Sequence, residues 1–183
     1  MKDERVIFSG TGGQGLMFIG KLFAQTAMEF YPHVTFMPSY GAEVRGGTSH
    51  CRVVLSGEEI ASPVVEIADS IVVMNQPSLD RFLPALQPGG RVVYNASMVQ
   101  APDMAGGAAI GPPATEWALA MGDIRVANVV MLGAYVRLVG IFPFETADRA
   151  IADFSAAKGP DAQALNRQAL KRGWDAADRV ESA

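Results

Sequence analysis

The chain has 183 residues, of which 49% are apolar and 19% charged, and its formal net charge is −4. This length suits one domain with a full core, so we treat residues 1–183 as a single unit. The acidic balance and the lack of a lysine or arginine cluster argue against binding to nucleic acid, where neutralising phosphates dominates affinity. The high apolar content predicts surface that is reserved for protein partners.

The cysteine and histidine content excludes several kinds of site. Cys51 is the only cysteine, so the chain can hold neither an internal disulfide nor a four-thiolate iron–sulfur cluster. His33 and His50 have no second ligand at a zinc-like spacing, so no metal site is expected. His50 and Cys51 would point to opposite faces of a strand, which predicts a core thiol and no Cys–His catalytic pair. Because residues 2–5 lead straight into a strand without a signal region, we expect a reducing, cytoplasmic location.

The first predicted elements are a strand over 5–9 and a helix over 15–30, joined by a glycine-rich turn. Gly10, Gly12 and Gly15 fit the spacing G-x-G-x-x-G, in which the missing Cβ atoms allow a tight turn and close backbone approach to a phosphate. The unpaired N–H groups of the following helix would stabilise an anion there. With Gly13 and Gln14, these glycines form the first half of the predicted cofactor site.

The second predicted strand, 34–37, lacks the carboxylate that binds ribose in dinucleotide-binding folds. Glu29 comes too early, and Glu43 follows only after a turn. A free-standing nucleotide-binding protein is therefore kept only as an alternative.

The segment after this strand is polar and rich in glycine, and it follows the sheet edge where α/β proteins bind ligands. We predict that this segment supplies the second half of the cofactor site. The simpler alternative is that it is a surface loop with an exposed ion pair. The residues are Tyr40, Glu43, Arg45, Gly46, Gly47 and Thr48.

The rest of the chain predicts strands over 51–55, 70–74 and 91–95, a helix over 77–86 and a turn over 87–90. A loop over 96–113 contains one short strand at 108–110, and helices follow over 115–120, 125–140, 144–154 and 161–181, the first capped by Thr115. Polar residues and Pro143 interrupt the apolar run 126–144, which favours a buried helix over a membrane span. We therefore predict a three-layer α/β fold, with five or six mostly parallel strands, helices on both faces and further C-terminal helices.

Four motifs in this order resemble the gamma subunit of 2-oxoacid:ferredoxin oxidoreductases. They are Gly10–Gly15, Ser39–Thr48, Asn75–Leu79 and Asn128–Ala134. The resemblance spans most of the chain and implies a Rossmann-like domain that is either a separate subunit or a section of one long polypeptide.

In that family the complex decarboxylates a 2-oxoacid oxidatively with coenzyme A, giving acyl-CoA, carbon dioxide and reduced ferredoxin. The resemblance implies that alpha, beta and ferredoxin-like delta subunits hold thiamine diphosphate, magnesium and the iron–sulfur clusters. This chain departs from the thiamine signature, because Ile124 follows Gly122-Asp123 where a glycine is needed. We therefore expect no catalytic residue here, and an inactive isolated chain that associates with itself.

The anion-ready turn and the Glu43–Thr48 segment suggest that this chain helps to form the coenzyme A site and the subunit interface. Two alternatives stay open: the glycines serve only helix–strand packing, or the chain is the small subunit of an indolepyruvate oxidoreductase, which shares the G-x-G-G-Q-G turn. The choice of 2-oxoacid would be made by other chains.

Overall fold

The computed structural model describes residues 2–39, 48–104 and 106–178. Five of the predicted site residues lie outside these ranges: Tyr40, Glu43, Arg45, Gly46 and Gly47.

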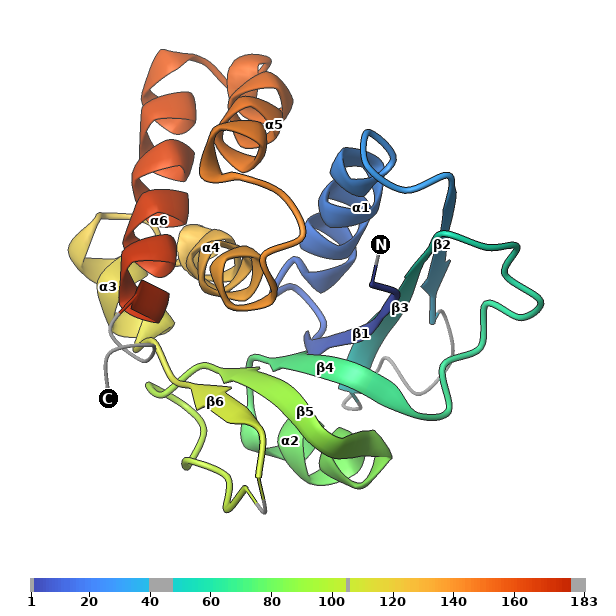
Figure 1. The fold of residues 1–183 in the computed structure, drawn as a ribbon. Helices are drawn as coiled ribbons and strands as arrows, with labels where there is room; N and C mark the ends of the chain where they lie inside the picture. The colour runs from blue at the N-terminus through green and yellow to red at the C-terminus, as the bar shows by residue number, and fades with distance from the viewer. Residues whose placement is uncertain (1, 40–47, 105, 179–183) are drawn as a thin grey trace.

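A single sheet forms the centre of the described chain, with the strand order β2-β3-β1-β4-β5-β6 (Figure 1). The strands are β1 Glu4–Thr11, β2 His33–Pro38, β3 Thr48–Ser56, β4 Ala68–Val73, β5 Leu86–Tyr94 and β6 Ala108–Ile110. The pairs β1–β4, β4–β5 and β5–β6 are parallel, whereas β3 is antiparallel to both of its neighbours. All the strands except β3 therefore run the same way, and their carboxyl ends share one edge of the sheet.

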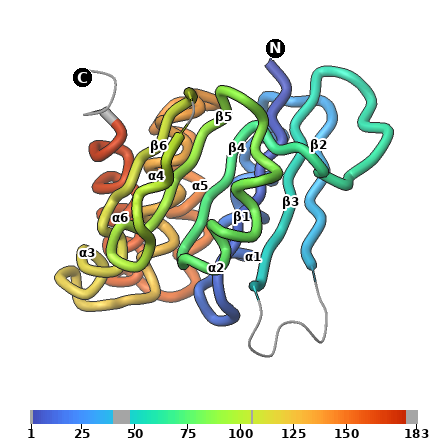
Figure 2. The backbone as a smooth tube through the Cα atoms, turned by 90° about the horizontal axis from the view of Figure 1, so that it is seen from below, coloured from blue at the N-terminus to red at the C-terminus, as the bar shows by residue number. Residues whose placement is uncertain are grey.

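Helices cover both faces of this sheet. They are α1 Leu16–Ala27, α2 Gln76–Phe82, α3 Ala114–Ala120, α4 Ala127–Val139, α5 Phe144–Ala156 and α6 Pro160–Asp178, with short 3-10 turns η2 Leu83–Ala85 and η3 Ile124–Val126. Helices α1 and α4 cover one face with α5 and α6 outside them, and α2 lies on the opposite face, which Figure 2 shows from below. The predicted three-layer arrangement is confirmed.

Buried strands divide their side chains between two cores. Alternate residues of β1 face opposite sides, so Phe8 joins the core under α1 and α4 while Ile7 joins the core under α2. In the larger core the ring of Tyr135 lies 5.4 Å from Phe8 and 5.2 Å from Phe23, in edge-on contacts. Burial on both faces explains why these strands read as continuous apolar runs.

Helices α4 and α6 approach each other backbone to backbone. A Cβ atom on Gly133 would overlap the carbonyl oxygen of Leu170, and one on Gly173 would overlap that of Val130. Two glycines on facing helices thus allow the close packing that holds α6 over α4.

Two local predictions differ from the structure. Residues 87–90, predicted as a turn, lie within β5, where the register against β4 shifts and Gly89 has a φ of 74°. Thr115 does not cap α3, because its Oγ1 accepts a hydrogen bond of 2.8 Å from the Asn95 side chain and Pro113 stands at the cap position. Among the residues that the structure describes, no helix has both the length and the apolar character needed to cross a bilayer.

Candidate functional site

The glycine turn links β1 to α1 at the carboxyl edge of the sheet. Gly13 and Gly15 have φ angles of 90° and 73°, a region that side chains with a Cβ rarely adopt. The Gln14 side chain closes the turn, since its Oε1 accepts a hydrogen bond of 2.7 Å from the Thr11 N–H. A Cβ on Gly10 would overlap this oxygen. Gly10 and Gln14 thus shape the turn, while Gly13 and Gly15 line the cavity beside it.

The turn is fastened to α4 by Asn128, which lies 113 residues further along the chain. The Asn128 Nδ2 donates a hydrogen bond of 3.3 Å to the Gly15 carbonyl oxygen, and a Cβ on Gly15 would overlap Nδ2. The Asn128 Oδ1 is buried and has no hydrogen-bond partner among the described residues, although the residue is only 5% exposed. A buried acceptor without a partner carries a free-energy cost.

Two other motifs from the sequence reach the same turn. Thr48, the one described residue of the predicted second half-site, pairs with Thr11 across β1 and β3. Its Oγ1 accepts a hydrogen bond of 2.5 Å from Arg81. Asn75 caps α2 through the Ser78 N–H and donates from Nδ2 to the Thr11 Oγ1 at 3.1 Å. The structure therefore brings Thr48 and the glycine turn together.

A cavity of about 800 Å³ opens beside the turn, within the usual size range of ligand sites. It is lined by Gly13, Gly15, Phe18, Met121, Gly122, Asp123, Arg125, Val126, Asn128, Phe154, Lys158, Asp161, Ala162, Leu165 and Asn166. The first turns of three long helices, α1, α4 and α6, contribute to this wall. No side chain caps the amino terminus of α1 or of α4. At the start of α4 the Ala127 N–H donates to the Ile124 carbonyl oxygen of η3, so the unpaired N–H groups are those of α1. These groups and the partial positive charges of the helix termini favour an anion in the cavity.

The charged side chains in the wall are two cations, Lys158 and Arg125, and two carboxylates, Asp123 and Asp161. Lys158 lies against two aromatic rings, with its Nζ 5.0 Å from the Phe154 ring centroid. Arg125 forms an ion pair of 2.6 Å with Asp123, and this hydrogen-bonded contact lowers the pKa of the Asp123 carboxyl. Asp161, in the first turn of α6, is the second carboxylate of the wall. Helix dipoles and Lys158 thus make the side of the cavity near the turn suitable for phosphate.

The predicted separation of His50 and Cys51 is confirmed. The ring centroid of His50 lies 4.9 Å from that of Phe82, the last residue of α2. The Cys51 Sγ lies on the other face of the sheet, 3.5 Å from the Leu16 carbonyl oxygen of α1. Burial raises the pKa of Cys51 to about 12. Cys51 is therefore a core thiol, as the sequence predicted.

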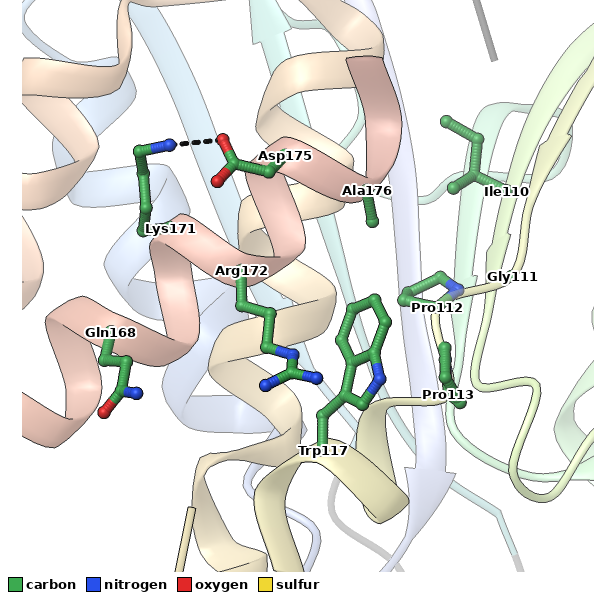
Figure 3. Close-up of a pocket in the computed structure, with 10 residues that line it drawn as sticks. All are labelled: Ile110, Gly111, Pro112, Pro113, Trp117, Gln168, Lys171, Arg172, Asp175 and Ala176. Carbon is green, nitrogen blue, oxygen red and sulfur yellow. Dashed lines mark hydrogen bonds and ion pairs between the residues drawn. The ribbon is translucent and has the colours of Figure 1, made fainter. Parts of the chain in front are cut away.

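A second cavity, of about 690 Å³, lies between α6 and the segment from β6 to α3 (Figure 3). The Arg172 guanidinium stacks 4.6 Å from the Trp117 ring centroid, and Lys171 pairs with Asp175 on the same helix. None of the residues predicted as site residues lines this cavity. The cavity at the glycine turn is therefore the candidate site.

Another buried polar cluster lies where β1 begins, far from the turn. The Glu4 carboxyl accepts hydrogen bonds from Ser70 at 2.5 Å, Arg91 at 2.5 Å and Tyr135 at 3.0 Å. Burial raises the pKa of Glu4, and these donors oppose that rise. Because its groups bind one another, we assign this cluster to the fold.

Sequence reasoning missed the residues that close the cavity opposite the turn. Asn128 was part of a motif, and a polar residue inside the apolar run 126–144 was the available signal for a role. Phe154 and Lys158 gave no such signal, because α5 and the following turn reach the site only through packing against α1 and α6.

A model of the family described as pyruvate ferredoxin/flavodoxin oxidoreductase matches residues 5–176. The ketoisovalerate oxidoreductase subunit VorA of Methanothermobacter thermautotrophicus is 44% identical over 138 residues, which make up 74% of this chain and 28% of that protein. The chain thus spans less than a third of the length of this relative.

Two solved structures have the same fold. The gamma subunit of a keto/oxoacid ferredoxin oxidoreductase from Geobacter sulfurreducens matches with 29% identity and a TM-score of 0.79, covering 96% of this chain and 99% of that one. The 2-oxoglutarate:ferredoxin oxidoreductase of Magnetococcus marinus, solved with 2-oxoglutarate, coenzyme A and succinyl-CoA bound, matches with 25% identity and a TM-score of 0.88, covering 100% of this chain and 32% of that one. The family resemblance and the α/β fold predicted from the sequence are confirmed.

Proposed function

Because the chain belongs to the pyruvate ferredoxin/flavodoxin oxidoreductase family, we propose that it is the gamma subunit, or the gamma section, of a cytoplasmic 2-oxoacid:ferredoxin oxidoreductase. The complex would convert a 2-oxoacid and coenzyme A into acyl-CoA and carbon dioxide, and the two electrons released would reduce ferredoxin. Thiamine diphosphate in a partner chain supplies the electron sink for decarboxylation, and iron–sulfur clusters in partner chains carry the electrons. We assign the choice of 2-oxoacid to those partner chains as well.

The part that this chain plays in the reaction is to hold coenzyme A. One observation carries this proposal: the amino termini of α1, α4 and α6 meet at the cavity beside the glycine turn, where Lys158 adds a positive charge. A diphosphate is the part of coenzyme A that such a wall binds, because N–H groups and helix dipoles stabilise phosphate without a dedicated basic cluster. Thr48, which pairs with Thr11 across β1 and β3, would extend the same site toward the partner chains.

The test is the Michaelis constant for coenzyme A in the assembled complex that carries Lys158→Met. Loss of one charge-assisted contact to phosphate should raise the KM for coenzyme A about tenfold or more. The kcat should stay close to that of the complex without the substitution. Lys21→Met is the matched control, since Lys21 is an exposed lysine of α1 that does not line the cavity. A complex that assembles normally and shows the same KM in both variants would contradict the proposed site.

A further inference from the structure

Two aromatic side chains form part of the cavity wall next to the glycine turn. Phe18 lies in the first turn of α1, and Phe154 lies in the last turn of α5. Their ring centroids are 4.1 Å apart with planes inclined by 30°. Phe154 keeps 44% of its surface exposed, which is unusual for a phenylalanine with so close an aromatic neighbour. Both rings line the cavity, and Phe18 lies within one helical turn of Gly15.

A positive charge lies beside this aromatic surface. The Lys158 Nζ is 5.0 Å from the Phe154 centroid and 5.8 Å from the Phe18 centroid. A cation close to a ring face is a favourable arrangement, and it also places a phosphate-binding group next to the rings. Phosphate and planar aromatic groups would thus be bound side by side in the cavity.

Two amide side chains provide acceptors in the same wall. The Asn166 Nδ2 donates a hydrogen bond of 2.7 Å to the Ala162 carbonyl oxygen, which leaves its Oδ1 as an acceptor. The Asn128 Oδ1 is the buried oxygen without a partner among the described residues. Hydroxyl and amino groups of a nucleoside are donors that such acceptors bind.

We propose that the cavity takes a nucleotide, with its phosphates at the glycine turn and its purine base stacked on Phe154. The inference rests on the proposed function, which makes the nucleotide the adenosine end of coenzyme A. Stacking suits this wall because a base presents a π-face, whereas the polar edge of the base can reach Asn166. The thiol arm would then leave the cavity toward the partner chains.

The experiment compares the assembled complex carrying Phe154→Ala with one carrying Phe154→Tyr, using coenzyme A and its two halves. Loss of the stacking surface in Phe154→Ala raises the KM for coenzyme A about tenfold, and Phe154→Tyr restores it. The KM for phosphopantetheine, which lacks the nucleotide, stays unchanged. Equilibrium dialysis of the bisphosphate nucleotide half against the complex, without 2-oxoacid, shows the same loss of affinity in Phe154→Ala. Met28→Ala is the control, because Met28 is 66% exposed at the other end of α1.

Each outcome separates the two proposals. A rise in KM for both coenzyme A and phosphopantetheine would mean that Phe154 only supports the fold, and it would overturn the stacking. An unchanged KM for coenzyme A in the Phe154→Ala complex would also overturn the stacking of the base on Phe154. If Lys158→Met weakens coenzyme A while Phe154→Ala does not, the base lies elsewhere and the proposed function survives. If neither variant has an effect, the site itself is wrong.

Discussion

At the scale of single residues, the site depends on a contact between two elements that are distant in the sequence. Gly15 has a left-handed backbone, and Asn128 packs where its Cβ would be. Gly13 shares the backbone geometry, but no atom lies within 4 Å of the position of its Cβ. A substitution at Gly13 therefore reports the free-energy cost of backbone strain alone, whereas one at Gly15 reports backbone strain together with the overlap with Asn128.

We expect Gly15→Ala to destabilise the protein more than Gly13→Ala does. Both variants bear the left-handed strain of roughly 1–2 kcal/mol. Gly15→Ala adds about 2 kcal/mol, since Asn128 must move and lose its hydrogen bond to the turn. Urea unfolding of the two variants measures the difference, and equal losses of stability would show that Asn128 does not brace the turn.

Cys51 gives a prediction on pH. Its pKa of about 12 in the folded protein lies above the ordinary value of 9.0, so the unfolded chain loses the thiol proton first as the pH rises. The free energy of unfolding therefore falls as the pH rises above 9.0, and this contribution is fully present at lower pH. At about pH 8 only about one folded thiol in ten thousand is ionised, so a thiol reagent should react with Cys51 only after unfolding. Rapid labelling of the native protein would contradict the core assignment.

At the scale of elements, the close approach of α4 and α6 matters most for the site. These helices carry Asn128 and Asn166, and their spacing is set by Gly133 and Gly173. The atoms that an added Cβ would overlap are backbone carbonyl oxygens, which cannot turn away as side chains can.

Gly133→Ala should therefore cost about 1–3 kcal/mol of stability, because the two helices must separate. The control is Gly57→Ala, where nothing lies within 4 Å of the added atom and φ is not positive, so its effect should stay within about 1 kcal/mol. Chemical denaturation of both variants measures the two effects. If Gly133→Ala proves as harmless as Gly57→Ala, the packing of α4 on α6 is looser than the structure indicates.

The helices and strands also show how much of the fold could be predicted from the sequence. Runs such as Ile71–Val73 and the turn Gly10–Gly15 gave the sheet and the first helix, because burial and backbone geometry are local signals. The prediction that Thr115 caps α3 was wrong because Asn95, which directly follows β5, donates a hydrogen bond to the Thr115 hydroxyl. The far wall of the cavity could not be predicted, since Phe154 and Lys158 reach it through tertiary packing alone.

At the scale of the whole molecule, the cavity beside the glycine turn is the place that we propose for coenzyme A. Cys51 lies buried in the core, and no group of three or more histidine, cysteine, aspartate or glutamate side chains that could hold a metal is found in the part of the chain that the structure describes. We propose that this chain holds coenzyme A and that its partner chains carry the electrons.

The most direct test is to purify the complex from its native cells through this chain and to measure ferredoxin reduction with several 2-oxoacids. We predict co-purifying chains with a thiamine diphosphate motif and cysteine-rich cluster motifs, and ferredoxin reduction that requires coenzyme A. A chain that elutes alone, supports no such reduction and binds NAD or ATP would contradict it.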